Sequence, residues 1–285
     1  MTTTVAAALA DARARGVALL DAQLLLGRVL ATTRTALIAH DERELAAGEI
    51  ERWWGLLARR AAGEPLAYLL GEKEFHGLVL EVTTDVLVPR PETELVVDWA
   101  SELLGERARR RLGGPPAEGP RVVDLGTGSG AIALALQRLH PEAHVVASDA
   151  SPAALAVARR NAARAGLAIE LVEGSWWAAV GGRRFDVAVA NPPYVAAGDP
   201  HLAALRHEPI EALASGGDGL DALRTIAAGA PARLLPGGWL VVEHGFEQGA
   251  AVRDLLARAG LVAVASRRDL AGLERATAGR RQDAG

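Results

Sequence analysis

An Asn-Pro-Pro-Tyr turn at residues 191–194 is the stretch of this chain whose residue types are best suited to chemistry. It follows an apolar run over residues 185–190 that predicts a buried strand. Because proline cannot donate to a sheet ladder, the strand must end at the turn. The turn presents the amide of Asn191, the carbonyl of Pro192 and the ring of Tyr194. These groups can hold a flat NH2-bearing group, either a side-chain amide or the exocyclic amine of a base; a plain strand terminator is the structural alternative.

A glycine-rich loop follows an earlier strand pattern. Gly126, Gly128 and Gly130 have the spacing G-x-G-x-G, which differs from the dinucleotide spacing G-x-G-x-x-G. Glycines permit a tight turn and let the backbone approach a ligand closely. Asp124 comes just before the loop, where a carboxylate would repel a phosphate and attract a cation. The charge therefore favours S-adenosylmethionine, which carries a sulfonium and an amino group, over the nicotinamide cofactor of a dehydrogenase.

Two further side chains follow later strand patterns. Asp149 ends the second strand of the pattern, where a carboxylate can accept hydrogen bonds from both hydroxyls of a ribose. Ser151 can cap the helix that begins at Pro152, which leaves Asp149 free for a ligand. Trp176 follows the third strand and can pack against adenine, whereas Trp177 is expected in the core.

Length and composition limit the class of protein. The chain has 285 residues, 50% of them hydrophobic, and a formal net charge of −4. This length predicts a large core and two domains. The absence of cysteine excludes disulfides and thiolate chemistry and fits a cytoplasmic protein. We expect no membrane span, because no apolar run is long enough, no metal site, and no general nucleic-acid binder, because the basic excess is missing.

The hydrophobic pattern divides the chain into three parts. Residues 1–73 predict a small helical bundle, with Leu19 and Leu20 among the apolar residues at helical spacing. Residues 74–90 alternate enough to predict a hairpin linker. Residues 91–285 form the third part, in which strands and helices alternate.

This alternation predicts a doubly wound, mostly parallel sheet with ligands at the carboxyl ends of its strands. The glycine loop, Asp149 and the Asn-Pro-Pro-Tyr turn all follow predicted strands. We expect strands at 121–125, 144–148, 169–173, 185–190, 239–243, 261–266 and 274–278, and helices at 131–139, 152–165, 221–234 and 246–259.

Taken in order, these motifs resemble the release-factor glutamine N5-methyltransferases (PrmC, formerly called HemK). Asn-Pro-Pro-Tyr alone is shared with adenine and other amine methyltransferases, whereas the helical domain and the Pro-Arg-Pro-Glu-Thr-Glu segment narrow the resemblance to this family. It covers nearly the whole chain. The residues that carry it are 63–65, 74–77, 89–94, 124–135, 191–194, 208–209 and 243–245.

The resemblance implies a class I methyltransferase-type fold with a small N-terminal helical bundle, S-adenosyl-L-methionine as cofactor, and methyl transfer to the Gln of the Gly-Gly-Gln motif of peptide-chain release factors. Residues 1–73 would help hold the release factor. No direct nucleic-acid or membrane partner is expected, and the enzyme would be a cytoplasmic monomer. Ser175 replaces the Asp that the family usually has beside the adenine, so a charge is missing there.

Matching the family motifs residue by residue assigns site roles. Asn191, Pro192 and Tyr194 would be catalytic, with Asn191 Oδ1 and the Pro192 carbonyl accepting the two N–H bonds of the substrate amide. The substrate would contact Asn191, Pro192, Pro193 and Tyr194. The cofactor would contact Gly126, Thr127, Gly128, Ser129, Gly130, Asp149, Trp176 and Asn191.

Two other functions remain open at this stage. A nucleic-acid methyltransferase acting on adenine N6 would use the same pocket, with Tyr194 stacked on a flipped base. The acidic balance and the absence of an evident target-recognition domain argue against it. A cofactor-binding interaction module without catalysis is a second alternative, and the intact Asn191 with both prolines argues against that.

Overall fold

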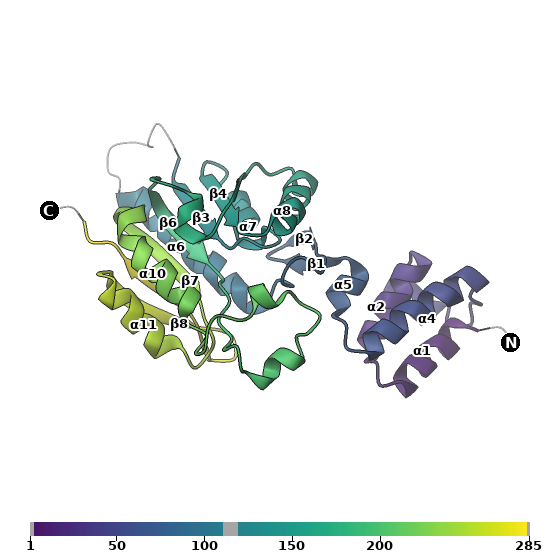
Figure 1. The fold of residues 1–285 in the computed structure, drawn as a ribbon. Coiled ribbons are helices and arrows are strands. Elements are labelled where there is room, and N and C mark those ends of the chain that lie inside the picture. The colour runs from purple at the N-terminus through teal and green to yellow at the C-terminus, as the bar shows by residue number, and fades with distance from the viewer. Residues whose placement is uncertain (1–2, 111–118, 284–285) are drawn as a thin grey trace. The chain divides into compact units, whose positions relative to one another are not determined.

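The computed structural model describes residues 3–110 and 119–283, without the side chains of 108–110 (Figure 1). The chain divides into two compact units, Met1–Lys73 and Glu74–Gly285. Within the described residues, no helix is both long and apolar enough to cross a membrane.

The first unit is helical, as predicted, and its core is built from Leu25, Leu26, Trp53 and Leu57, all fully buried. Leu19 and Leu20, which belong to the same apolar pattern at helical spacing, are instead about half exposed and lie outside this core. They begin a helix on the side that faces solvent. The helices of this unit are α1 Val5–Ala14, α2 Leu19–Leu30, α3 Arg34–Ala39, α4 Ala47–Ala61 and α5 Leu66–Leu70.

A two-stranded sheet follows, formed by β1 Glu72–Phe75 and β2 Leu78–Glu81. The turn between them consists of His76 and Gly77, with φ of 48° and 73°. Two consecutive positive φ angles are typical of the tight turns that join hairpin strands. We predicted a bundle, a linker and a catalytic part from the sequence. The boundaries and the roles of these three parts remain predictions.

The second unit is a sheet flanked by helices. Within the described residues the sheet has seven strands in the order β5-β4-β3-β6-β7-β9-β8, and β9 is antiparallel to both of its neighbours. In chain order the elements are η1 Pro91–Thr93, α6 Glu94–Arg110, β3 Arg121–Leu125, α7 Ala131–Leu139, β4 His144–Asp149, α8 Pro152–Ala165, β5 Glu170–Glu173, α9 Trp176–Ala179, β6 Phe185–Ala190, η2 Pro200–Ala203, η3 Ile210–Ala212, α10 Asp221–Arg233, β7 Leu234–Glu243, α11 Gly249–Arg258, β8 Val262–Arg268 and β9 Glu274–Arg280.

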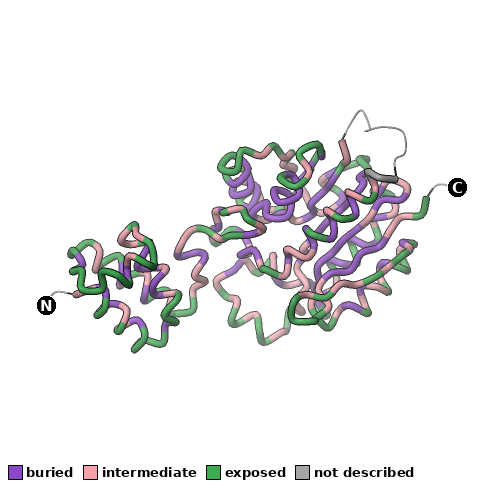
Figure 2. Tube along the Cα trace, turned by 180° about the vertical axis from the view of Figure 1, so that it is seen from behind, coloured by how far each residue is buried: buried purple, intermediate pink, exposed green. Residues whose placement is uncertain are grey.

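The central strands are buried on both faces, and Figure 2 shows this part of the chain as buried. Alternate residues of one strand therefore enter two different core layers. Val187 and Val189 of β6 pack with helices α6 and α7 on one face. Ala188 and Ala190 pack with α10 and α11 on the other. The predicted doubly wound, mostly parallel sheet is thus confirmed.

The order in which successive strands are added to the sheet reverses at its centre. Strand β3 has β4 on one side and β6 on the other, and all three run parallel. Loops that leave β3 and β6 diverge to opposite faces, and ligands of open α/β sheets bind in the crevice that results. The glycine loop follows β3 and the Asn-Pro-Pro-Tyr turn follows β6, so both lie at this crevice.

Two elements begin several residues away from their predicted start, and the other predicted boundaries agree with the structure or differ by one or two residues. Strand β7 begins at Leu234 because its irregular Pro-Gly-Gly stretch is absorbed by a bulge, where Phe185 pairs with Leu234 and Val187 with Trp239. Helix α11 begins at Gly249 and not at Phe246, which is half exposed in the turn before the helix.

Candidate active site

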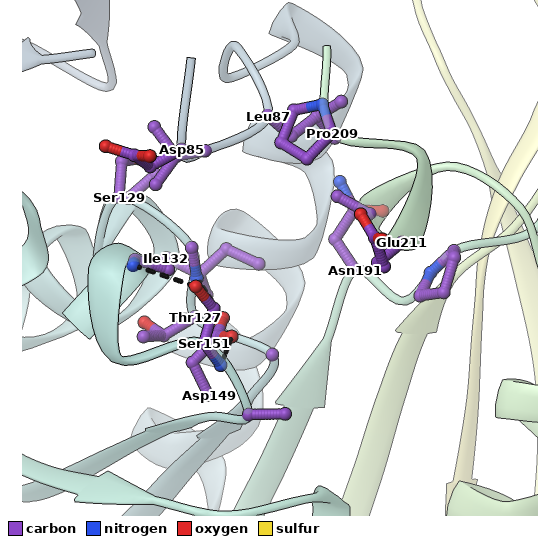
Figure 3. A pocket seen from close by; sticks show the side chains of 18 of the residues that line it. Asp85, Leu87, Thr127, Ser129, Ile132, Asp149, Ser151, Asn191, Pro209 and Glu211 are labelled. Atoms are coloured by element: carbon purple, nitrogen blue, oxygen red, sulfur yellow. Dashed lines mark hydrogen bonds between the residues drawn. The ribbon is translucent and has the colours of Figure 1, made fainter. Parts of the chain in front are cut away.

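A cavity of about 400 Å³ opens where strands β3, β4, β5 and β6 end. We call it the strand-end cavity. Figure 3 shows Asn191, Pro209 and Glu211 on one side of it and Thr127, Ser151 and Asp149 on another. Its lining residues come from the segments 85–93, 126–132, 149–154, 174–176, 191–193 and 209–212.

The glycine loop is pinned to the neighbouring strand. Gly126 and Gly128 have φ of 78° and 55°, in the left-handed region that favours glycine. The backbone N–H groups of Gly126 and Thr127 donate to the carbonyl of Ser148 on β4, at 2.9 and 2.8 Å. The loop backbone is therefore fixed where it lines the strand-end cavity.

Asp124 fixes the position of this loop through two hydrogen bonds. Its Oδ2 accepts from the Thr127 hydroxyl at 2.7 Å and from the Ala133 N–H at 3.2 Å. The side chain is fully buried and does not line the cavity, and burial raises the pKa of Asp124 to about 7. The sequence argument that set this carboxylate beside a cationic ligand is therefore wrong about its place.

Asp149 lines the cavity at the end of β4, and each of its carboxylate oxygens accepts one hydrogen bond from a backbone N–H group. Oδ2 accepts from the Gly128 N–H and Oδ1 from the Ser151 N–H, each at 2.9 Å. Ser151 caps helix α8 as predicted, since its hydroxyl accepts from the Ala154 N–H at 3.2 Å. Each Asp149 oxygen keeps a second lone pair, which can accept from the hydroxyl of a ligand.

Trp176 and Ser175 line the cavity after β5. Trp176 has a φ of 44°, which is rare for a bulky residue and marks a strained backbone that the surrounding structure maintains. Trp177 is buried in the core, as predicted, and its indole Nε1 donates to the Ile226 carbonyl at 2.8 Å.

Only one end of the Asn191 side-chain amide has a hydrogen-bond partner among the described residues. Its Nδ2 donates to the Thr93 hydroxyl at 3.0 Å. Its Oδ1 is buried and has no hydrogen-bond partner among the residues that the structure describes. A buried acceptor without a partner costs free energy, so this oxygen is a place where a ligand donor would be stabilised. Pro193 lines the cavity beside it.

Tyr194 supports the turn from behind. Its hydroxyl donates to Glu243 Oε1 at 3.2 Å. Its carbonyl accepts from Gln248 Nε2 at 3.0 Å, and Gln248 Oε1 accepts from the Gly245 N–H at 2.9 Å. Burial and the nearby Glu243 carboxylate raise the pKa of Tyr194. The turn is thus tied to the loop that follows β7.

The structure brings most of the predicted site residues to the cavity. Gly130, Pro192 and Tyr194 do not line it. Gly130 lets helix α7 approach α8, because a Cβ built there would lie 3.3 Å from the Ala158 Cβ. The predicted residues that line the cavity are Gly126, Thr127, Gly128, Ser129, Asp149, Trp176, Asn191 and Pro193.

Sequence reasoning missed several residues of the wall. Thr93 and Glu211 line the cavity; Thr93 lies in the Pro-Arg-Pro-Glu-Thr-Glu segment, whereas none of the sequence motifs includes Glu211. Glu208 is buried and accepts from the Val88 N–H at 3.1 Å and from the Arg90 guanidinium. This ion pair joins two segments that are far apart in the sequence and that each contribute a residue to the cavity lining, Pro89 and Pro209.

Comparison with known proteins identifies the family. Residues 93–265 match the methyltransferase small domain, and residues 3–71 match the PrmC N-terminal domain. A release factor glutamine methyltransferase of Xylella fastidiosa is 51% identical over 263 residues, which cover 91% of this chain and 92% of the relative. This chain belongs to the release factor glutamine methyltransferase family. A family member from Burkholderia pseudomallei is 50% identical to this methyltransferase over 92% of the chain and 91% of the relative.

Solved structures share the fold of this methyltransferase. A methyltransferase from Pyrococcus furiosus has a TM-score of 0.52 at 19% identity, over 72% of this chain and 90% of its own. The hMettl16 catalytic domain has a TM-score of 0.56 at 18% identity, over 80% of this chain and 82% of its own. At such low identity these likenesses show the class I methyltransferase fold alone.

Proposed function

We propose that this protein transfers a methyl group from S-adenosyl-L-methionine to the side-chain amide N5 of the Gln in the Gly-Gly-Gln motif of peptide-chain release factors. The names of the relatives support the substrate. The structural observation that carries the proposal is the buried, unpartnered Oδ1 of Asn191 beside the strand-end cavity. An acceptor in that place suits a guest with an N–H donor, such as a primary amide.

The residues of the strand-end cavity fit the cofactor. The open lone pairs of Asp149 suit the two ribose hydroxyls, and the glycine backbone at Gly126 and Gly128 leaves room for close approach. Trp176 offers an aromatic face for the adenine. When bound, S-adenosyl-L-methionine supplies an electrophilic methyl group on a positively charged sulfur.

The protein acts on the amide by orientation and polarisation. An amide nitrogen is a weak nucleophile because its lone pair is delocalised into the carbonyl. Asn191 Oδ1 and the Pro192 carbonyl accept its two N–H bonds, which fixes the nitrogen and raises its electron density. After transfer the nitrogen is acidic and loses its proton to water, so no strong general base is required. Pro193 shapes the pocket around the amide plane, and Tyr194 holds the turn in place from behind through Glu243 and Gln248.

Ser175 gives this chain a weaker contact with adenine than an Asp would. Its exposed side chain lies at the edge of the cavity and carries a hydroxyl without charge. A hydroxyl can accept one hydrogen bond from the adenine amine, whereas a carboxylate would add a charge-assisted one. We therefore expect cofactor affinity to increase in Ser175→Asp.

The same proposal includes the protein partner, the cellular location and the oligomeric state. The helical unit at residues 1–73 helps hold the release factor, and the enzyme acts as a cytoplasmic monomer without direct nucleic-acid or membrane partners. The family match over residues 3–71 supports this role for the helical unit.

A substrate competition separates the proposal from its rivals. A purified release factor and a DNA duplex are each incubated with the protein and cofactor carrying a labelled methyl group. We expect label on the release factor alone. Label on the duplex would favour an adenine methyltransferase, and the absence of label on both in a single-turnover reaction would favour a binding module without catalysis.

A further inference from the structure

The orientation of the Asn191 amide is not fixed by shape, because its oxygen and its NH2 group have nearly the same size. Only one orientation presents an acceptor to a substrate amide. In the other, the NH2 of Asn191 would face the NH2 of the substrate, and no hydrogen bond would form. Some other group must therefore decide which end of the side chain is available.

Thr93 is the group in contact with the NH2 end. Its oxygen accepts from Asn191 Nδ2 at 3.0 Å, and the residue is 3% exposed. A hydroxyl has one proton and can direct it to either of two neighbours. If that proton pointed to Asn191, the amide would turn over and its oxygen would no longer be open.

Glu243, at the end of β7, is 1% exposed, and the Thr93 hydroxyl is one of the groups that interact with its carboxylate. Burial raises the pKa of Glu243 to about 7, while the hydroxyls of Thr93 and Tyr194 act in the opposite direction by stabilising its charged form. An ionised carboxylate can only accept. In its ionised form Glu243 therefore draws the Thr93 proton to itself and leaves the Thr93 lone pair for Asn191.

Glu243 also holds the other end of the turn. The Tyr194 hydroxyl donates to its Oε1 at 3.2 Å. The last residue of Asn-Pro-Pro-Tyr is therefore hydrogen-bonded directly to this carboxylate. The other carboxylate oxygen, Oε2, is buried and has no hydrogen-bond partner among the described residues, so it is open to the Thr93 proton. None of the site assignments made from the sequence includes Thr93 or Glu243.

We infer that Thr93 and Glu243 are positioning residues that orient the Asn191 amide, so that its oxygen and not its NH2 group faces the substrate glutamine. This inference rests on the proposed function. In this arrangement Asn191 Nδ2 donates to the Thr93 hydroxyl, as the structure shows, and that hydroxyl turns its own proton to the open oxygen of Glu243.

Thr93→Val is the first test, since valine keeps the branched shape and removes the hydroxyl. We expect kcat to fall about tenfold or more, because the acceptor is no longer held in place. The KM for the release factor and the Kd for the cofactor should each change by less than about threefold. Thr93→Ser restores the hydroxyl and should recover most of the lost kcat. Thr225→Val, on the outer face of α10, is the matched control and should retain wild-type turnover.

Glu243→Gln tests the direction of the hydrogen bonds. A glutamine can donate to Thr93, which frees the Thr93 proton to point to Asn191. We expect a loss of kcat similar to that of Thr93→Val in a protein that melts as cooperatively as wild type. If Thr93→Val does not fold, Glu243→Gln still tests the inference.

Wild-type kcat in both Thr93→Val and Glu243→Gln would overturn the inference. So would a Thr93→Ser variant as slow as Thr93→Val, or a loss confined to cofactor affinity. The proposed function is tested separately, because it fails only if the wild-type protein does not methylate a release factor.

Discussion

Gly126 packs directly against Trp176: a Cβ built on the glycine would lie 3.1 Å from Cζ3 of the indole. The two residues follow different strands, β3 and β5, and they form adjoining parts of the strand-end cavity. Two features therefore favour glycine at position 126: its φ is 78°, and the Trp176 indole occupies the space that a side chain would need.

Gly126→Ala should therefore weaken cofactor binding. The methyl group would displace the Trp176 ring, which lines the cavity, so we expect the Kd for S-adenosyl-L-methionine to rise about tenfold. Isothermal titration calorimetry measures this. Gly182→Ala is the control, since a Cβ there meets nothing within 4 Å and its φ is ordinary. Equal Kd values in the two variants would contradict the packing argument.

Asn191→Ala should lower turnover far more than cofactor affinity. Loss of one oriented acceptor is expected to reduce kcat about a hundredfold, while the Kd for cofactor should stay within about threefold of wild type, because Asp149 and the glycine loop hold the cofactor. Steady-state kinetics and calorimetry on the same preparation measure both. Near-normal turnover would contradict the orienting role of Asn191.

The pair of Arg90 and Glu208 should stabilise the cavity wall. Arg90→Ala leaves the Glu208 carboxylate buried without its cation, so we expect a loss of about 2 kcal/mol in the free energy of unfolding. Adding Glu208→Gln removes the buried charge and should recover part of that loss. Urea denaturation measures both.

The matched control for this pair is Arg224→Ala, which breaks exposed ion pairs with Asp218 and Asp221 and should change the free energy of unfolding much less than Arg90→Ala does. A double variant less stable than Arg90→Ala alone would contradict the buried-charge explanation.

Asp124 should make stability depend on pH. Its pKa rises from 3.8 in the unfolded chain to about 7 in the folded protein because of burial. The folded state therefore binds a proton more tightly than the unfolded state, and the free energy of unfolding should fall as pH rises between these values and then level off. The buried Glu243 adds a slope of the same sign.

Asp124→Asn should make that slope shallower, as measured by urea denaturation at about pH 5 and about pH 8. An unchanged slope would show that Asp124 titrates in the folded protein as it does in the unfolded chain.

The sequence predicted the elements whose patterns are strong. Helices α7 and α8 and strand β6 have the predicted bounds, because each has a clear apolar period and a glycine or proline at an end. The start of β7 was missed because its Pro-Gly-Gly stretch has no strand pattern, and only pairing with β6 through a bulge makes it a strand.

The cavity was harder to predict than the fold. Residues that follow strands, such as Asp149 and Asn191, could be placed because parallel strands bring their carboxyl ends to one edge. Contacts that depend on the packing of distant segments could not. Thr93 and Asn191 are 98 residues apart, and no local pattern indicates their hydrogen bond. Asp124 was misplaced because its position in sequence does not show which way its side chain points.

Mass spectrometry of a release factor after incubation with this protein and S-adenosyl-L-methionine tests the central claim most directly. We expect the mass of one methyl group on the side chain of the Gln in Gly-Gly-Gln, and no such mass when Asn191→Ala replaces the wild-type protein for the same short time. An unmodified Gln after many equivalents of wild-type protein, or a methyl group on another residue, would contradict the proposed function.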